Sequence, residues 1–189
     1  MRVLETERLL IRNWEDRDRD AFHRLNADEA VMRFFPFRRT RAEADSFMDE
    51  LTEDNRARGF GFAAVVNRAT GECIGMAGLK PTCDVPLRQP EAIEIGWRVL
   101  PEHWRNGYAS EAAATLIAFG FRELDLLEIV SFAVQHNEPS IAVMRRLGMS
   151  RIADGDFDHP SVDASHPELR RFVLYALSRA TWQARATTA

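Results

Sequence analysis

A short loop holding one glycine is the first feature of this sequence that could do chemistry. The loop, Arg105 to Ser110, follows an apolar run and leads into an alanine-rich segment with helical spacing. The first N–H groups of a helix lack intrahelical partners and carry partial positive charge, so they can bind a phosphate or pyrophosphate. Gly107 lets the main chain approach an anion, and Ala109 adds only a small side chain in the first turn of the helix. Arg105 adds positive charge. The alternative is an ordinary loop between a strand and a helix.

Two better-known phosphate signatures do not match this loop. A P-loop requires lysine followed by serine or threonine at the start of the helix, and this loop contains no lysine. A dinucleotide fingerprint requires three spaced glycines, and only Gly107 lies here. The pattern therefore predicts a pyrophosphate loop with a single glycine.

Two apolar runs flank this loop and its helix, and they predict the strands that position it. Residues 93–100 alternate, with Glu94, Gly96 and Arg98 on one face and apolar residues on the other. The run from Glu128 to Val134 is apolar on both faces, as in a central strand. A strand, a helix and a strand of this length imply a right-handed crossover and a parallel strand pair.

The remaining patterns predict a chain of alternating strands and helices. Thr40 is a good N-cap, and Glu43 completes a capping box for a helix that runs to Arg58. Four glycines in the segment that follows (Gly59, Gly61, Gly75 and Gly78) indicate close packing or a bulge. The other predicted elements are strands at 4–12, 60–67, 73–80, 149–153 and 170–177, helices at 16–26 and 137–147, a loop at 81–90 and a frayed tail at 180–189.

Length and composition limit the possible classes of protein. With 189 residues and 46% hydrophobic content, we expect one domain over residues 1–189. The net charge of −4 gives no support for nucleic-acid binding. Two isolated cysteines, Cys73 and Cys83, argue against a metal site and against a disulfide framework. Because the sequence has neither a signal peptide pattern nor a long apolar stretch, we expect a cytoplasmic protein with no membrane partner.

Four segments carry a family resemblance: TERLLIR at 6–12, EIGWRVL at 94–100, PEHWRNGYASEA at 101–112 and NEPSIAVMRRLGM at 137–149. Together they resemble the GCN5-related N-acetyltransferase (GNAT) superfamily, and most of all its ribosomal-protein alanine and serine N-acetyltransferases. The resemblance covers a core from about residue 4 to about residue 178. It implies a mixed α/β fold in which a sheet of about seven strands has helices on both faces and a splayed parallel pair at its centre.

The pyrophosphate loop departs from the family pattern at two positions. That pattern is often Gln/Arg-x-x-Gly-x-Gly/Ala, and here Trp104 stands at its first position. Arg105 stands where this branch usually has glycine. Because backbone N–H groups bind the anion, the site itself is still expected, while the geometry of the loop is left open.

The resemblance implies acetyl-CoA as the co-substrate. Its pantetheine arm is expected to pair with the backbone near Val99 and Leu100. In this branch the serine of Asn-x-x-Ser, here Ser140, is proposed to hydrogen-bond the coenzyme sulfur and to protonate the thiolate, while Asn137 could also be a simple N-cap. The candidate coenzyme-binding residues are Trp97, Val99, Leu100, Arg105, Asn106, Gly107, Tyr108, Ala109, Ser110, Asn137 and Ser140.

Acetyl transfer to an amine requires a group that removes a proton from the ammonium form. Glu94 is the first candidate, since superfamily members often place a catalytic glutamate on this strand; its structural alternative is an ion pair with Arg98. His159, beside Asp158, is the second candidate, because an imidazole titrates near neutrality. Its alternative is an ordinary loop residue.

The acceptor is expected to be the N-terminal α-amine of a protein or peptide, or a small amine. Phe34 and Phe35, in the Met/Phe cluster at 31–37, are candidate acceptor-binding residues, with core packing as the alternative. The loop at 81–90 could border the same site. The acidic composition gives weak support for a cationic acceptor.

The sequence therefore predicts an acetyl-CoA-dependent N-acetyltransferase that works by direct transfer in a ternary complex, without a metal. Neither cysteine has a histidine nearby in sequence, which argues against a covalent acyl-enzyme. The alternative is a non-catalytic acyl-CoA sensor or partner-binding module on the same fold. A homodimer is common in this branch.

Overall fold

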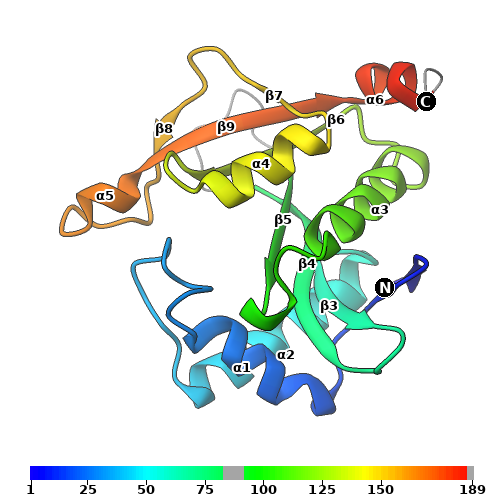
Figure 1. Cartoon of the computed structure of the whole chain (residues 1–189), viewed down its shortest axis with the longest axis vertical. Helices are drawn as coiled ribbons and strands as arrows, with labels where there is room; N and C mark the ends of the chain where they lie inside the picture. Colours follow the sequence, from blue (N-terminus) through cyan, green and yellow to red (C-terminus); the bar gives the residue numbers. More distant parts are fainter. Residues whose placement is uncertain (83–91, 187–189) are drawn as a thin grey trace. The chain divides into compact units, whose positions relative to one another are not determined.

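The computed structural model describes residues 1–82 and 92–186 (Figure 1). These residues group into two compact units. The first unit is Met1–Lys80 with Gly96–Leu116, and the second is Pro81–Ile95 with Ile117–Ala189. Strand β5, Ile93–Val99, and helix α3, Tyr108–Arg122, each contribute residues to both units. The predicted loop at 81–90 lies almost entirely outside the described residues.

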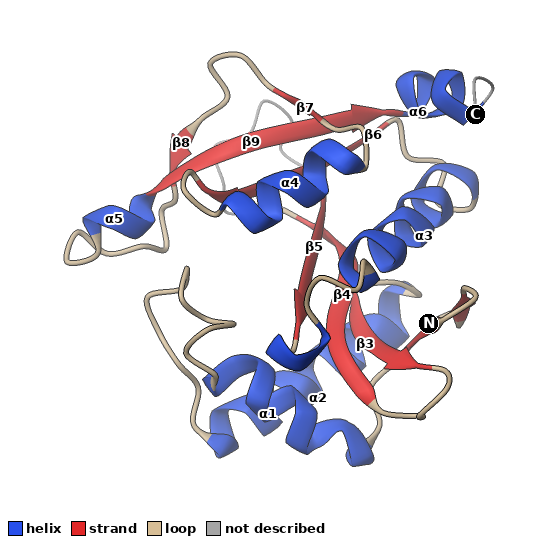
Figure 2. Cartoon of the chain, viewed as in Figure 1, coloured by secondary structure: helices blue, strands red, loops and turns tan. Residues whose placement is uncertain are grey.

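The first unit is built on an antiparallel set of strands. Its other elements are β1 (Leu4–Glu5), β2 (Leu9–Arg12), η1 (Asp16–Asp18), α1 (Arg19–Ala27), α2 (Arg41–Arg58), β3 (Phe62–Asn67), β4 (Cys73–Pro81) and η2 (Pro101–His103). Strand β2 pairs with β3 and β3 with β4, all antiparallel, and α1 lies against α2 (Figure 2). The prediction of one strand over 4–12 was wrong, because the chain turns at Thr6 and β1 folds back onto β2.

Helix α2 begins and ends as its sequence predicts. The Thr40 hydroxyl accepts a hydrogen bond from the Glu43 N–H, and the Glu43 carboxylate accepts one from the Thr40 N–H at 2.8 Å. The helix ends at Arg58, where Gly59 takes a left-handed conformation with φ of 80°. The capping box and the glycine C-cap are local signals, which is why the sequence alone located this helix.

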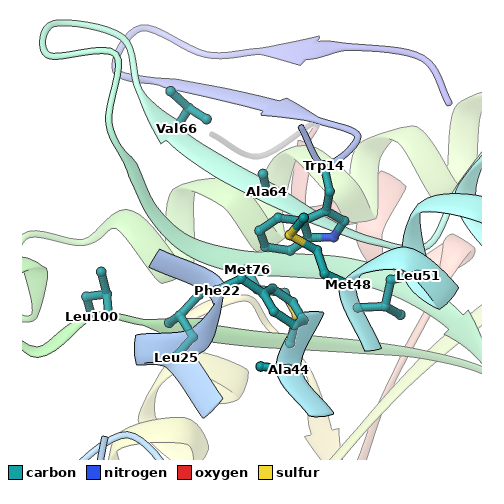
Figure 3. Close-up of a cluster of buried hydrophobic side chains, with 10 residues drawn as sticks. All are labelled: Trp14, Phe22, Leu25, Ala44, Met48, Leu51, Ala64, Val66, Met76 and Leu100. Carbon is teal, nitrogen blue, oxygen red and sulfur yellow. The ribbon is translucent and has the colours of Figure 1, made fainter. Parts of the chain in front are cut away.

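Helices α1 and α2 bury their apolar faces against strands β3 and β4. Phe22 is fully buried, and its ring meets the ring of Trp14 edge to face at 4.6 Å. Burying a side chain of this size contributes about 1.5–3 kcal/mol. Figure 3 shows the resulting cluster of Trp14, Phe22, Leu25, Ala44, Met48, Leu51, Ala64, Val66, Met76 and Leu100.

A buried ion pair holds the turn between β2 and α1. Arg12 donates two hydrogen bonds to the Asp18 carboxylate, at 2.6 and 3.0 Å, and both side chains are almost fully buried. The hydrogen bond to Asp18 raises the pKa of the Arg12 guanidinium, even though burial works in the opposite direction. The first unit therefore matches this buried positive charge with a carboxylate.

The close packing that the glycines predict occurs where β3 approaches β4. A Cβ atom at Gly78 would lie 2.1 Å from the Gly61 carbonyl oxygen, a distance that no folded chain tolerates. The register also shifts between Val65 and Val66, as at a β-bulge. The sequence prediction of close packing or a bulge is confirmed at this strand pair.

The second unit places β6, Glu128–Val134, between two different neighbours. Strand β6 runs parallel to β5, with Glu94 opposite Val130, and antiparallel to β9, with Glu128 opposite Ser178. The predicted parallel pair is confirmed. The other elements of this unit are α4 (Glu138–Arg146), β7 (Ser150–Arg151), β8 (Phe157–Asp158), α5 (Pro167–Arg170), β9 (Arg171–Ser178) and α6 (Arg179–Ala186).

One predicted element near the end of the chain is shorter than expected, and another prediction there was wrong. The strand predicted at 149–153 is only Ser150–Arg151, and the tail predicted at 180–189 is helical through Ala186. The Trp182 ring lies 5.4 Å from the Phe121 ring, and Arg179 Nη1 donates to Asp125 at 2.7 Å. These contacts anchor α6, and they join residues far apart in sequence.

The fold is mixed α/β, and among the described residues its strand pairs are antiparallel except for β5 and β6. The described residues form nine strands rather than about seven, because the predicted strand at 4–12 is divided into β1 and β2 and because β8, a strand of two residues, was not predicted. None of the helices in this part of the chain is both long and apolar enough to cross a membrane.

Candidate active site

The loop before α3 is shaped by two residues in the left-handed conformation. Arg105 has φ of 62° and Gly107 has φ of 80°. The Glu111 N–H donates to the Gly107 carbonyl at 3.0 Å and so makes the first turn of the helix. The N–H groups of Tyr108 and Ala109, which precede Glu111, therefore belong to the turn that has no intrahelical acceptor. This geometry suits an anion, because backbone donors converge at the positive end of the helix.

Side chains of the first unit hold the loop in this shape. The Asn106 side chain donates to the carbonyls of His103 and Trp104, at 3.2 and 3.1 Å. Arg8 donates to the Asn106 carbonyl at 3.0 Å and to the Glu111 carboxylate at 2.7 Å. The Arg8 guanidinium also lies 4.7 Å from the centre of the Tyr108 ring. The predicted loop residues from Arg105 to Gly107 are exposed, and Tyr108, Ala109 and Ser110 are half-buried.

The end of β5 is tied to both the loop and β4. The Trp104 indole N–H donates to the Val99 carbonyl at 2.6 Å, and the Leu100 N–H donates to the Ile74 carbonyl at 2.9 Å. A Cβ atom at Gly75 would lie 2.5 Å from the Arg98 carbonyl oxygen. Trp97 is half-buried on the same strand. Sequence reasoning treated Trp104 only as a departure from the family pattern and missed that it links the loop to the strand.

In the second unit, Asn137 caps the helix that carries Ser140. The Asn137 side-chain oxygen accepts a hydrogen bond from the Ser140 N–H at 3.3 Å, so the N-cap interpretation of Asn137 is confirmed. Both residues are half-buried. Within the described residues the Ser140 hydroxyl makes no hydrogen bond.

Glu94 is half-buried on β5, at the position where that strand pairs with β6. At the next residue, the Ile95 carbonyl accepts a hydrogen bond from the Ser131 hydroxyl at 2.9 Å. Ser131 is itself buried, so this side chain fixes the backbone next to Glu94. Sequence reasoning missed Ser131, since nothing in an apolar strand identifies a serine as a partner for the neighbouring strand.

His159 lies in an aromatic cluster of the second unit. Its ring centre is 4.9 Å from that of Phe172 and 6.0 Å from that of Phe132. The Ser161 N–H donates to His159 Nδ1 at 3.2 Å, which places the proton of the neutral ring on Nε2. Asp158 interacts with Arg170 and Arg171 at 3.7 and 3.4 Å. In this arrangement His159 Nε2 is a hydrogen-bond donor.

Cys73 is poorly suited to act as a nucleophile. Burial raises the pKa of its thiol to about 12, and the thiol donates to the Gly75 carbonyl at 3.5 Å. A cysteine nucleophile reacts as the thiolate, which this environment disfavours near neutral pH. Cys83 lies outside the described residues. No group of three or more potential metal-ligating side chains occurs in the described ranges.

The candidate acceptor residues lie near two arginines of the first unit. Phe35 lies 4.8 Å below the Arg98 guanidinium, and Phe34 lies 4.5 Å from that of Arg33. Arg98 donates to Asn26 at 2.9 Å and contacts the Met32 sulfur at 3.2 Å, so its hydrogen bonds are made within its own unit. Sequence reasoning considered Arg98 only as a partner for Glu94.

Comparison with known proteins decides the family. The model of the acetyltransferase (GNAT) domain matches residues 8–150. The chain belongs to the GNAT acetyltransferase family. This membership, together with relatives that are named N-acetyltransferases, identifies an acetyltransferase enzyme, and GNAT enzymes use acetyl-CoA as co-substrate.

Individual relatives of this GNAT chain differ in their names. It is 32% identical over 151 residues to the uncharacterized N-acetyltransferase YnaD of Bacillus subtilis, a match that covers 78% of this chain and 82% of that protein. It is 29% identical over 186 residues to the FsC-acetyl coenzyme A-N(2)-transacetylase of Aspergillus fumigatus, covering 95% of this chain and 77% of that protein.

Solved structures show the same GNAT fold. A GNAT acetyltransferase from Bacillus anthracis superposes with a TM-score of 0.77 at 27% identity, over 94% of this chain and 98% of that one. The ribosomal-protein-S5-alanine acetyltransferase of Vibrio fischeri superposes with a TM-score of 0.73 at 16% identity, over 96% of this chain and 99% of that one. At that identity the likeness establishes the fold alone.

Proposed function

We propose that this GNAT enzyme moves the acetyl group of acetyl-CoA to a primary amine by direct attack in a ternary complex. The observation that supports the proposal is the loop before α3, in which Arg105 and Gly107 are left-handed, a geometry that suits an anion at the start of the helix. Its backbone N–H groups would bind the pyrophosphate, with the Arg105 side chain adding charge. The main chain at Val99 and Leu100 would pair with the pantetheine arm.

Glu94 is the proposed base. It would accept a proton from the ammonium form of the acceptor, directly or through water, so that the amine lone pair can attack the thioester carbonyl carbon. Glu94 is half-buried on β5, at the position where that strand pairs with β6. His159 is the weaker candidate, because its Nε2 carries the proton in the observed hydrogen-bonding arrangement.

Ser140 is the proposed donor to the leaving group. When the carbon–sulfur bond breaks, its hydroxyl would hydrogen-bond or protonate the thiolate, and solvent would then return a proton to Ser140. The hydroxyl makes no hydrogen bond to the described part of the chain, which supports this role. The high pKa of the Cys73 thiol supports direct transfer over an acyl-cysteine intermediate.

The experiment tests several classes of amine as acceptors. Thiol release from acetyl-CoA would be measured against N-terminal peptides, free amino acids, polyamines and aminoglycosides, beside calorimetry of acetyl-CoA alone. We expect tight coenzyme binding and turnover on one class of amine. Absence of coenzyme binding would refute the role of the loop, and binding without turnover on any amine would contradict catalysis on these acceptors and favour the acyl-CoA sensor.

Two expectations about the cell belong to the same proposal. A cytoplasmic location would be checked by fractionation, and a homodimer by light scattering after gel filtration. Neither is required by the chemistry of the site.

A further inference from the structure

Two arginines of the first unit donate hydrogen bonds to the same uncharged side chain. Arg98 Nη1 and Arg39 Nη1 both donate to the side-chain oxygen of Asn26, at 2.9 and 3.4 Å. Asn26 is fully buried and is fixed by a 2.8 Å hydrogen bond from its Nδ2 to the Phe22 carbonyl. One amide oxygen therefore holds two guanidinium groups that repel each other.

Neither guanidinium forms an ion pair with any carboxylate in residues 1–82 and 92–186. Burial, together with the charge of Arg39, lowers the pKa of Arg98 to about 10. Burial also lowers the pKa of Arg39, against the more distant charges of Glu43 and Glu50. Both arginines are half-buried, so their positive charges are not fully solvated, and no carboxylate of the described residues pairs with them.

This arrangement differs from that of two other arginines of the same unit. Arg12, which is buried, is paired with Asp18, and Arg41 donates to both Asp45 and Asp20. Arg41 is only two residues from Arg39 along the chain. Arg12 and Arg41 thus have carboxylate partners, whereas Arg98 and Arg39 have none among the described residues. Leaving a partly buried positive charge without a carboxylate is costly unless a ligand brings the anion.

Aromatic rings define how a ligand could reach the pair. Phe35 lies 4.8 Å from the Arg98 guanidinium, while Phe37 and Phe47 lie 4.7 and 4.2 Å from that of Arg39. Rings that stack on guanidinium planes leave the N–H edges for a planar anion. Asn26 and Met32 both contact the same nitrogen of Arg98, Nη1. The Phe37 side chain is 44% exposed, so this cluster of rings and arginines reaches the surface.

We propose that Arg98 and Arg39 bind a carboxylate of the amine acceptor. This inference rests on the proposed acetyl transfer. Arg98 directly precedes Val99, the residue whose backbone is proposed to meet the coenzyme. A guanidinium pair matches a carboxylate through parallel N–H donors, and the phenylalanine rings suit an apolar neighbour of that carboxylate. The acceptor is therefore an amino acid or the acidic N-terminal end of a peptide, rather than a polyamine.

Matched acceptors test the proposal. Thiol release would be compared for phenylalanine and phenylalaninamide, for 4-aminobutyrate and its amide, and for two dipeptide amides that differ only as aspartate and asparagine. We expect kcat/KM for the acid to exceed that for the amide by about 10- to 100-fold in at least one pair. The free amino acids and the dipeptides distinguish a small acceptor from a peptide end. Equal values for acid and amide in every pair that turns over would overturn the proposal.

Variants of Arg98 and Arg39 test whether these residues cause the preference for the acid over the amide. In Arg98→Gln or Arg39→Gln, the ratio of kcat/KM for the acid to kcat/KM for the amide should fall toward one, because the acid loses more of its kcat/KM than the amide does. Arg98→Lys, which keeps the charge without the planar fork, guards against a folding defect and should retain part of the preference. The control is Arg41→Gln, which removes one charge from the same region and should leave the ratio unchanged. A ratio unchanged in all three variants of Arg98 and Arg39 would overturn the assignment.

A binding measurement separates this proposal from the proposed function. Calorimetry would compare N-acetylphenylalanine with its amide in the wild type, in Arg98→Gln and in Arg41→Gln. A preference for the acid that falls at least tenfold only in Arg98→Gln supports the carboxylate site, even if no amine is acetylated. Equal binding of acid and amide, or an equal loss in both variants, would overturn the site while leaving any observed acetyl transfer in place.

Discussion

At the scale of single residues, Arg105 combines two opposing properties. Its φ of 62° is a conformation that costs a residue with a Cβ atom about 1–2 kcal/mol, while its charge stands next to the proposed pyrophosphate site. Arg105→Gly should therefore raise the free energy of unfolding by about 0.5–1 kcal/mol, after allowing for the added freedom of the unfolded chain. Chemical denaturation measures this gain.

The same substitution should weaken acetyl-CoA binding by several-fold, as measured by calorimetry, because one mobile positive charge is lost. Arg105→Ala is the matched control, since it removes the charge and keeps the strain. We expect it to weaken binding to a similar degree without adding stability. If both variants bind acetyl-CoA as the wild type does, the Arg105 side chain has no role in holding the pyrophosphate.

Glu94 offers the second prediction at this scale. Glu94→Gln should lower kcat by about 10²- to 10⁴-fold, because the amide cannot accept the ammonium proton. It should also remove the acidic limb of the pH profile and leave acetyl-CoA affinity nearly unchanged. The pH dependence of kcat and coenzyme calorimetry check these expectations. Unchanged turnover would reject Glu94 as the base and leave His159 as the candidate to test.

At the scale of elements, the contact between β4 and the end of β5 sets the backbone that is proposed to meet the pantetheine arm. A Cβ atom at Gly75 would lie 2.5 Å from the Arg98 carbonyl oxygen and 3.2 Å from the Val99 Cα. Gly75→Ala should therefore push β5 away from β4. We expect a loss of about 1–3 kcal/mol in stability and a loss of at least tenfold in acetyl-CoA affinity.

Gly71 provides the control for this prediction. It lies in the turn between β3 and β4 with φ of 74°, and a Cβ atom there would have no neighbour within 4 Å. Gly71→Ala should cost about 1 kcal/mol through backbone strain and leave coenzyme affinity unchanged. If calorimetry finds the same affinity loss in both variants, the contact at Gly75 does not position the coenzyme.

Elements with local signals were predicted well from the sequence. The capping box of Thr40 and Glu43, the Asn137 cap and the apolar run of β6 each lie within a few residues of the structure that they specify. Helix α6 was missed because its anchor, Trp182 against Phe121, joins residues that no local pattern connects.

In the candidate site, too, features with local signals were predicted and contacts between distant residues were not. The sequence located the loop. It did not predict the left-handed conformation of Arg105, because arginine, unlike the glycine of the family pattern, is not a residue type that indicates this conformation. The contact of Arg98 and Arg39 with Asn26 could not be predicted either, because these three residues come from three different segments of the chain. The overall acidic composition pointed weakly to a cationic acceptor, whereas the local charge at these arginines favours an anionic group.

At the scale of the whole molecule, Cys73 links unfolding to pH. Burial holds the pKa of its thiol at about 12 in the folded protein, whereas an unfolded cysteine has its ordinary value of 9.0. Below pH 9 the thiol is protonated in both states and contributes no pH dependence. Between pH 9 and 12 only the unfolded chain releases this proton, so the free energy of unfolding should fall by up to about 1.4 kcal/mol per pH unit.

Cys73→Ala isolates this contribution from the other groups that titrate in the same range. The variant should be less stable than the wild type at pH 8, because it loses part of a packed side chain. As the pH rises from 9 to 11, the difference should shrink, since only the wild type carries the unfavourable linkage. Denaturant titrations of both proteins at each pH measure this difference in the free energy of unfolding. If the free energies of both proteins fall equally with pH, the thiol ionises as freely in the folded protein as in the unfolded chain.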